Sequence, residues 1–252
     1  MILNPLHISA RNKLILVGLF LSKFDTVGLG VLGFEGFTEA FNVLGYALGG
    51  KPASIKNYRD EFDPLFPNLR KGWHHRKPRS YCAEVLEEYG SLDIRMFSDL
   101  INSFVSYAVV ESSELPPDEE GADSAFARRL ITGLAAEQYF ESVQADLDEF
   151  RNYDVENTTR LGCGYDFRLR NKTDNAFLAV EVKGMKDRSG GIMFTPKEYQ
   201  AAAALTDRFY LFVVKNFREA PFHEIYRNPL ASPLRFERKE RVIVQVSWFT
   251  SI

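Results

Sequence analysis

The sequence has few of the residues that mark several common protein classes. Only 2 of its 252 residues are cysteine, too few for a small secreted scaffold held together by disulfides. Its longest apolar run, Leu14–Leu21, is far shorter than the ~20 residues that cross a bilayer. No basic start followed by an apolar stretch and a small-residue cleavage site is found, so no signal peptide is expected. We therefore expect a cytoplasmic protein in which Cys82 and Cys163 are unpaired thiols.

Charge is nearly balanced overall but unevenly distributed. The 31 Lys and Arg against 34 Asp and Glu leave a net charge of −3, which by itself argues against a nucleic-acid partner. The segment Lys51–Arg79, however, carries eight bases against three acids, a net +5, and Glu111–Asp123 carries six acids and no base. A local basic patch is the electrostatic requirement for phosphate binding, and an ordinary solvated surface is the alternative.

The acidic stretch also predicts a domain boundary. Pro116 and Pro117 lie among acids and serines, a composition typical of an extended, solvated linker. With 45% hydrophobic and 26% charged residues, the rest of the chain has ordinary globular composition. We predict a domain at 1–111, a linker at 112–124 and a second domain at 125–252.

The N-terminal domain is expected to be mainly helical. Ser9–Phe24 and Phe37–Leu48 have helical patterns, and Gly49-Gly50 then ends the second helix. Pro52 suits the first turn of a further helix over Ala53–Phe62. Two helices joined by a tight turn resemble a helix-turn-helix, although such pairs also occur in purely structural bundles. The candidate DNA contacts are Lys51, Ser54, Lys56, Asn57, Tyr58, Arg59, Arg70, Lys71 and Arg76.

Two further patterns in this domain are weaker. Gly28–Gly33 matches G-x-G-x-x-G, but no strand precedes it, so we expect a glycine-rich connection between helices and no nucleotide cofactor. His74-His75 lacks a Cys or His partner at metal-ligand spacing, so we expect no metal there.

The C-terminal domain shows an α-β-β-β-α-β order of elements, typical of a mixed sheet flanked by helices. The fold class expected for the whole chain is therefore α/β (α+β). The predicted helices are Phe126–Phe150 and Pro196–Thr206, and the predicted strands are Leu161–Arg170, Ala176–Lys183, Ile192–Thr195, Arg208–Asn216 and Arg241–Phe249.

The strand with Glu181-Val182-Lys183 has two charged residues on one face, because side chains alternate along a strand. A hairpin turn centred between Thr173 and Asp174 places residues whose numbers sum to 347 opposite each other, which pairs Asp166 with Glu181. Two facing carboxylates repel unless a cation lies between them, and they suit a hard ion such as Mg²⁺. The alternative is a ladder of ordinary surface ion pairs.

Five short motifs occur in order over residues 128–217. They are Gly133–Glu137, Gly164–Asp166, Val180–Gly184, Phe194–Glu198 and Tyr210–Asn216. The set resembles the nuclease-like C-terminal domain of NO VEIN-type proteins and, more broadly, the PD-(D/E)XK nuclease superfamily, whose core has the same element order. Two positions depart from the pattern: Tyr165 replaces the superfamily's proline, and the F-x-x-T spacing is shortened to Phe194-Thr195.

The resemblance implies a metal-dependent nuclease. Asp166 and Glu181 would bind Mg²⁺, with the Val182 carbonyl as a further ligand and Mn²⁺ as a substitute metal. Lys183 would orient or help to deprotonate the attacking water. Glu137 would bind a second ion or hold a metal-bound water, with an ordinary helix-surface glutamate as the alternative. Lys197, in the first turn of its helix, is a candidate phosphate contact.

The function expected is that of a Mg-dependent DNA endonuclease, site-specific or modification-dependent, in prokaryotic restriction or phage defence. Its partners would be double-stranded DNA and a second copy of the chain, with no membrane. Two alternatives stay open: a DNA-binding module with an inactive nuclease-like core, and a nuclease acting on RNA or on branched or damaged DNA.

Overall fold

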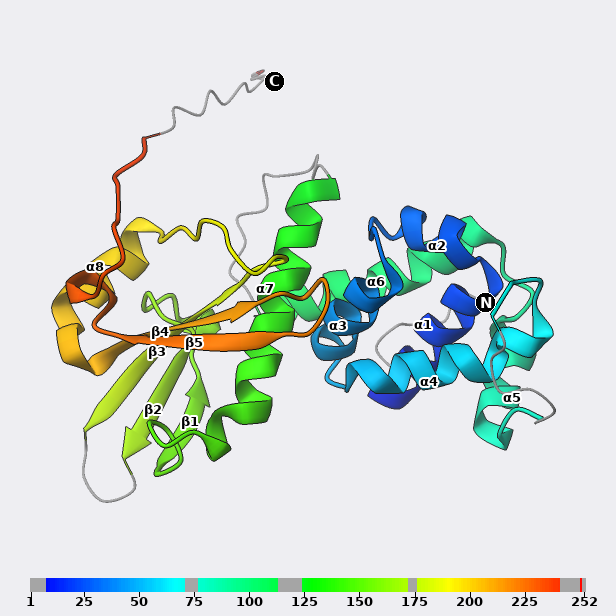
Figure 1. Cartoon of the computed structure of the whole chain (residues 1–252), viewed down its shortest axis with the longest axis horizontal. Helices are drawn as coiled ribbons and strands as arrows, with labels where there is room; N and C mark the ends of the chain where they lie inside the picture. The colour runs from blue at the N-terminus through cyan, green and yellow to red at the C-terminus, as the bar shows by residue number, and fades with distance from the viewer. Residues whose placement is uncertain (1–7, 71–76, 113–123, 172–175, 241–249, 251–252) are drawn as a thin grey trace.

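The computed structural model describes residues 8–70, 77–112, 124–171, 176–240 and 250. It has an α+β architecture in which a helical part precedes a five-stranded mixed sheet (Figure 1). The fold class predicted from the sequence is therefore confirmed. Within the described ranges, no helix is both long and apolar enough to cross a membrane.

The helical part contains the three helices predicted from its sequence. Ser9 caps the first of them, since its side chain accepts a hydrogen bond from the Asn12 amide at 3.2 Å. The pair α3–α4 is joined by a short turn in which Gly49 has a φ of +71°, a conformation that favours glycine. The helices are α1 Ala10–Lys23, α2 Asp25–Val31, α3 Phe37–Ala47, α4 Pro52–Phe62, α5 Ser80–Tyr89 and α6 Ile94–Ser112.

The glycine-rich segment after α1 is a helix and not the connection that we expected. Gly28 lies in α2, where a Cβ atom would be 2.8 Å from the Phe24 Cβ and 2.9 Å from the Phe20 ring. Glycine is thus required there because α2 packs very closely on these phenylalanines.

The sheet has the order β1-β2-β3-β4-β5, and only β3 and β4 are parallel. Helix α7 (Ser124–Val143) packs on one face of the sheet, and α8 (Pro196–Leu205), which connects β3 to β4, lies on the other (Figure 1). The strands are β1 Tyr153–Asn157, β2 Phe167–Asn171, β3 Phe177–Gly184, β4 Phe209–Lys215 and β5 Phe222–Arg227.

The order α-β-β-β-α-β is present as α7-β1-β2-β3-α8-β4, but two of its members differ from the prediction. The strand expected at Ile192–Thr195 does not form, and β1 supplies the third strand instead. Helix α7 ends at Val143, earlier than the predicted end at Phe150. Strand β2 begins at Phe167, later than the predicted start at Leu161. Strand β5 was not predicted, and Arg241–Phe249 lies outside the described residues.

The helical part and the sheet share one continuous core of buried hydrophobic residues. Between them, the Asn42 side chain in α3 donates to the carbonyls of Phe217 at 2.8 Å and Glu219 at 3.0 Å, just after β4. Lys186, just after β3, binds Glu35 at 2.7 Å and the buried Glu39 at 3.3 Å. The linker proposed at 112–124 falls almost wholly on residues outside the description, so the division into two domains stays a prediction.

Replacing Asn42 by Ala is expected to destabilise the fold by about 1–3 kcal/mol, because two partly buried carbonyls lose their donor. Urea unfolding followed by circular dichroism measures the change. Asn57→Ala is the matched control, since Asn57 is exposed on α4 and should change stability by less than about 0.5 kcal/mol. Equal midpoints for the two variants would contradict the role given to Asn42.

Candidate functional site

The hairpin register predicted from the sequence is confirmed. Phe167 pairs with Val180 and Arg168 with Ala179, so facing residues have numbers that sum to 347. Asp166 directly precedes β2, and its amide still donates to the Val180 carbonyl at 3.1 Å. Its carboxylate Oδ2 accepts from the Val182 amide at 2.8 Å, which holds the side chain against β3.

Glu181 and Lys183 point to the face of the sheet that carries α8. Glu181 is only 2% exposed. The charged face of this strand is therefore covered and does not lie open to solvent. The Lys183 ammonium lies 2.6 Å from Glu181 Oε1 and 2.8 Å from Glu198 Oε2, so one cation bridges two carboxylates.

Glu198 is a site residue that the candidate set omitted. It forms a capping box with Thr195: the Glu198 amide donates to Thr195 Oγ1 at 3.3 Å, and Glu198 Oε2 accepts from the Thr195 amide at 2.9 Å. The signal was present as Thr195-Pro196-Lys197-Glu198, because a Thr followed three residues later by Glu marks a helix start. The cap thereby directs the Glu198 carboxylate toward Lys183.

The carboxyl groups of the site are difficult to ionise together. Burial and the neighbouring Asp166 raise the pKa of Glu181 well above its ordinary value, and Lys183 only partly opposes them. Burial raises the pKa of Asp166 to about 6, against the Val182 amide and Lys183, which lower it. Burial, together with Asp166 and Glu141, also raises the pKa of Glu137 on α7. Burial alone would lower the pKa of Lys183, but Glu181 and Glu198 raise it.

A cleft of about 240 Å³ opens beside these groups. One wall is the loop before β2, in which Gly162 and Gly164 have φ values of +58° and +83°. A Cβ atom on Gly164 would lie 2.6 Å from the Lys197 carbonyl oxygen, so glycine lets this loop close onto the start of α8. The lining residues are Thr159, Gly162, Cys163, Gly164, Tyr165, Asp166, Glu181, Thr195, Lys197 and Glu198.

The donor set fits a hard divalent cation in its chemistry but is not assembled as a complete metal cage. Asp166 and Glu181 supply carboxylate oxygens, the ligand type that Mg²⁺ prefers. Across the described part of the chain, no three His, Cys, Asp or Glu side chains are grouped so that they could hold a metal ion. Any ion there would therefore complete its coordination with backbone and solvent oxygens. It would also have to share the Glu181 carboxylate with Lys183, which contacts it.

The structure separates the candidate DNA contacts into different groups. Lys197 is exposed at the cleft, while Lys51, Lys56 and Asn57 are exposed on the α4 side and Ser54 is half-buried. Tyr58 packs edge-on against Tyr81. Lys71 and Arg76 lie outside the described residues.

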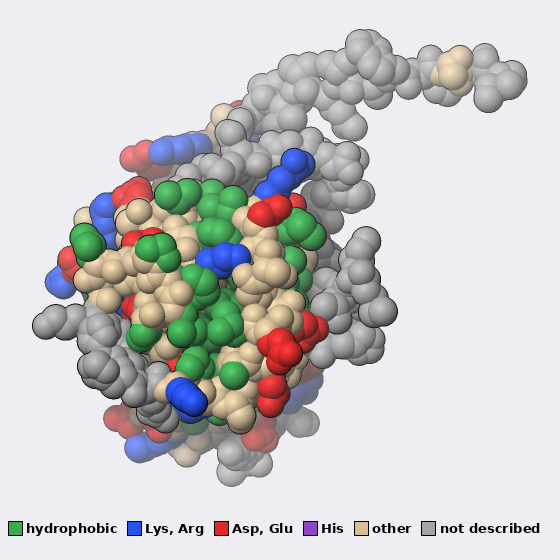
Figure 2. Space-filling model, turned by 90° about the vertical axis from the view of Figure 1, so that its right-hand side faces the viewer, with side chains coloured by type: hydrophobic (Ala, Val, Ile, Leu, Met, Phe, Trp, Pro, Cys, Tyr) green, Lys and Arg blue, Asp and Glu red, His purple; other side chains and the backbone are tan. Residues whose placement is uncertain are grey.

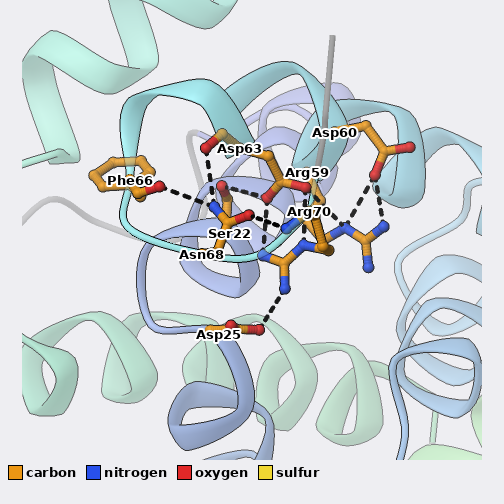
Figure 3. A network of polar contacts seen from close by, with 8 residues as sticks. All are labelled: Ser22, Asp25, Arg59, Asp60, Asp63, Phe66, Asn68 and Arg70. Carbon is orange, nitrogen blue, oxygen red and sulfur yellow. Dashed lines mark hydrogen bonds and ion pairs between the residues drawn. The ribbon is translucent and has the colours of Figure 1, made fainter. Parts of the chain in front are cut away.

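Two of the candidates, Arg59 and Arg70, are structural. Arg59 is 8% exposed and pairs with Asp60 at 2.6 Å and with Asp63 at 3.8 Å. Arg70 pairs with the buried Asp63 at 2.9 Å and with Asp25, and the Ser22 hydroxyl also donates to Asp63 (Figure 3). Their charge is balanced within the helical part, which argues against the expectation that both arginines contact DNA.

The surface agrees with this reassignment. Figure 2 views the helical end of the molecule, where hydrophobic side chains fill much of the middle and the Lys and Arg side chains in view are few and separate. The Lys and Arg side chains of the described residues thus do not form a continuous basic patch on the face seen there.

Replacing Asp166 by Asn is expected to raise the melting temperature of the metal-free protein at pH 8. The folded-state pKa of about 6 lies above the ordinary value of 3.8, so the ionised carboxylate destabilises the fold above pH 6 and not below pH 3.8. Asn keeps an oxygen for the Val182 amide. The gain should be roughly 1–3 kcal/mol at pH 8 and should shrink toward pH 4.

Thermal unfolding in EDTA at both pH values measures this gain. Asp148→Asn is the control, because its side chain is 82% exposed and its loss should leave the melting temperature nearly unchanged. A lower melting temperature for Asp166→Asn at pH 8 would overturn the electrostatic account of the site.

Comparison with known proteins supports part of the resemblance seen in the motifs. No curated protein and no solved structure matches the chain. A family model described as "Protein NO VEIN, C-terminal" matches residues 136–227. The matched stretch contains all the residues that line the cleft, and also Glu137 and Lys183, which lie near it without lining it. The cleft thus lies within a segment similar to the C-terminal domain of NO VEIN proteins.

Proposed function

We propose that the chain is a metal-dependent nuclease that hydrolyses DNA phosphodiester bonds. The observation that carries the proposal is the meeting of Asp166, Glu181 and Lys183 beside one cleft. Two carboxylates can ligate a divalent cation, and a neighbouring lysine can orient a water molecule. The match to the NO VEIN C-terminal domain over the same residues supports the assignment.

The charge balance of the site also favours a cation. Asp166 raises the pKa values of Glu137 and Glu181, and Glu198 raises those of Asp166 and Glu181. Lys183 is the one cation among the groups that shift these pKa values. Full ionisation would leave an excess of negative charge with little exposure to water. A bound Mg²⁺ or Mn²⁺ would relieve that repulsion and would supply charge stabilisation at the phosphate.

The residues of the chain have distinct parts in the proposed reaction. Asp166 and Glu181 would hold the ion, with the Val182 carbonyl as a further ligand, and Glu137 would hold a second ion or a water molecule. Lys183 would keep its contact with Glu198 and present an N–H to the attacking water, which fixes the direction of attack. Lys197, exposed at the mouth of the cleft in the first turn of α8, would bind a neighbouring phosphate.

We further propose a biological role for this nuclease activity. A DNA nuclease core joined to a helical part suits a restriction or phage-defence endonuclease, either site-specific or modification-dependent. Cutting both strands of a symmetric duplex site would favour a homodimer, in which two clefts are related by a two-fold axis.

One observation favours a second candidate, a DNA-binding module with an inactive core. The Lys183 ammonium lies 2.6 Å from Glu181 Oε1, where it occupies part of the carboxylate that a metal would need. If that ion pair persists with Mg²⁺ present, the protein would bind DNA without cutting it.

Replacing Lys183 by Gln is expected to lower the cleavage rate by at least about 100-fold, because the water loses its orienting group, while DNA binding persists. Asp166→Asn should have a similar effect through loss of a metal ligand. The assay incubates plasmid and phage DNA with the purified protein in Mg²⁺ or in EDTA and resolves the products on a gel.

Lys215→Gln is the matched control for Lys183→Gln. Lys215 lies on the adjacent strand, is 16% exposed and contacts Glu224 at 2.6 Å, so its burial and pairing resemble those of Lys183 outside the cleft. The control should cut at the wild-type rate. Full cleavage by Lys183→Gln would remove its role, and binding without Mg²⁺-dependent cutting by the wild type would favour the inactive core. Cutting of branched or single-stranded substrates alone would indicate a repair nuclease.

A further inference from the structure

Three helices that are distant in sequence bring two arginines and two tyrosines together on the helical part. Arg11 lies in the first turn of α1, Tyr58 in α4, and Arg79 and Tyr81 at the start of α5. We refer to Arg11, Tyr58, Arg79 and Tyr81 as the arginine–tyrosine cluster. None of its members takes part in the cleft.

The cluster holds Arg11 in place through its aromatic members. The Arg11 guanidinium carbon lies 3.7 Å from the centre of the Tyr81 ring, which is a close cation–π contact. Hydrogen bonding with the side chains of Tyr81 and Tyr58 raises the pKa of Arg11. The two tyrosine rings lie 6.5 Å apart in an edge-on arrangement. These contacts restrict an exposed side chain that would otherwise sample many rotamers.

The two arginines of the cluster differ in their charge partners. Arg79 stacks on Tyr81 at 4.9 Å but is bonded to the buried carboxylate of Glu61. Arg11 makes none of the ion pairs found among the described residues, and the groups that raise its pKa are the two tyrosines, not a carboxylate. The fold thus orders an exposed positive charge for which the described part of the chain provides no counterion.

The remaining polar groups of the cluster suit an anion. A tyrosine hydroxyl that accepts a hydrogen bond from Arg11 keeps its own proton, which it can donate to a further acceptor. The guanidinium has five N–H groups in a planar fork, of which the tyrosines use only part. Lys77, exposed two residues before Arg79, adds a second cation nearby.

We propose that the arginine–tyrosine cluster binds a backbone phosphate of duplex DNA, with Arg11 as the direct contact. This inference rests on DNA as the ligand of the proposed nuclease, but it concerns binding and not cleavage. It gives the helical part a phosphate contact in place of Arg59 and Arg70, whose charges are balanced internally. Arginine suits this role because its donors match the spacing of phosphate oxygens and its charge is permanent.

The test measures binding of a fluorescent duplex by anisotropy in EDTA, so that no cutting occurs. Arg11→Gln should weaken binding by about 5- to 10-fold and reduce the salt dependence of the affinity by about one phosphate contact. Arg11→Lys should recover part of the affinity. Arg95→Gln, the matched control, removes an exposed arginine on α6 with no cluster around it and should bind like the wild type.

A second variant separates phosphate binding from stability. Tyr81→Phe keeps the ring beneath Arg11 but removes one hydroxyl, so it should weaken binding by less than Arg11→Gln at an unchanged melting temperature. Wild-type affinity and salt dependence in Arg11→Gln would overturn the inference, as would an equal loss in Arg95→Gln.

The outcomes distinguish this inference from the nuclease itself. If the wild type cuts with Mg²⁺ but Arg11→Gln binds DNA normally, the proposed contact of the cluster is refuted and the proposed nuclease activity stands. If the wild type does not cut but Arg11→Gln binds DNA more weakly, the proposed contact of the cluster is supported and the proposed nuclease activity is refuted. No duplex binding by the wild type at low salt overturns the inference outright.

Discussion

The bridge that Lys183 makes between Glu181 and Glu198 is the interaction on which the cleft depends. It ties β3 to the first turn of α8, two elements that the chain reaches through the segment 185–195. Without that cation, two carboxylates of low exposure would lie close together beside Asp166, which is unfavourable unless they are protonated or meet another cation. The Thr195 cap and the close approach of Gly164 to Lys197 both act to keep α8 where the bridge needs it. The site therefore holds mutually repelling carboxylates together through one positive charge, an arrangement that is often found at functional sites.

The parts of the site that the sequence predicts are those set by local geometry. The period of two along a strand and the position of one turn were enough to place Asp166 against β3 and to set the register of β2 with β3. The beginnings of α1, α4 and α8 followed from Ser9, Pro52 and Pro196. Failures came where no local rule applies. Residues 161–166 are apolar enough for a strand, but Gly162 and Gly164 adopt positive φ and turn the chain. Ile192–Thr195 has strand-forming residues but pairs with none of the strands that the structure describes.

The roles of the arginines in the helical part could not be predicted from the sequence, for a different reason. Arg11, Arg59 and Arg70 are equivalent when only composition is considered. Their roles differ through partners far along the chain. Arg70 meets Asp25 across 45 residues, whereas the partners that the structure describes for Arg11 are tyrosines. A count of bases cannot tell a cation that stabilises a core from one that is available to a ligand, because burial of the counterion is a property of the fold. The net charge of a segment is thus a poor guide to its partner until each ion pair is known.

The contacts around Asn42 have a further consequence. They join α3 to the segments that follow β3 and β4, the strands that carry or flank Lys183, and the hydrophobic core continues through the same region. These contacts limit movement between α3 and the strands that carry the cleft. In the proposed nuclease, the distance from a DNA contact on the helical part to the cleft would then determine which phosphodiester bond is cut.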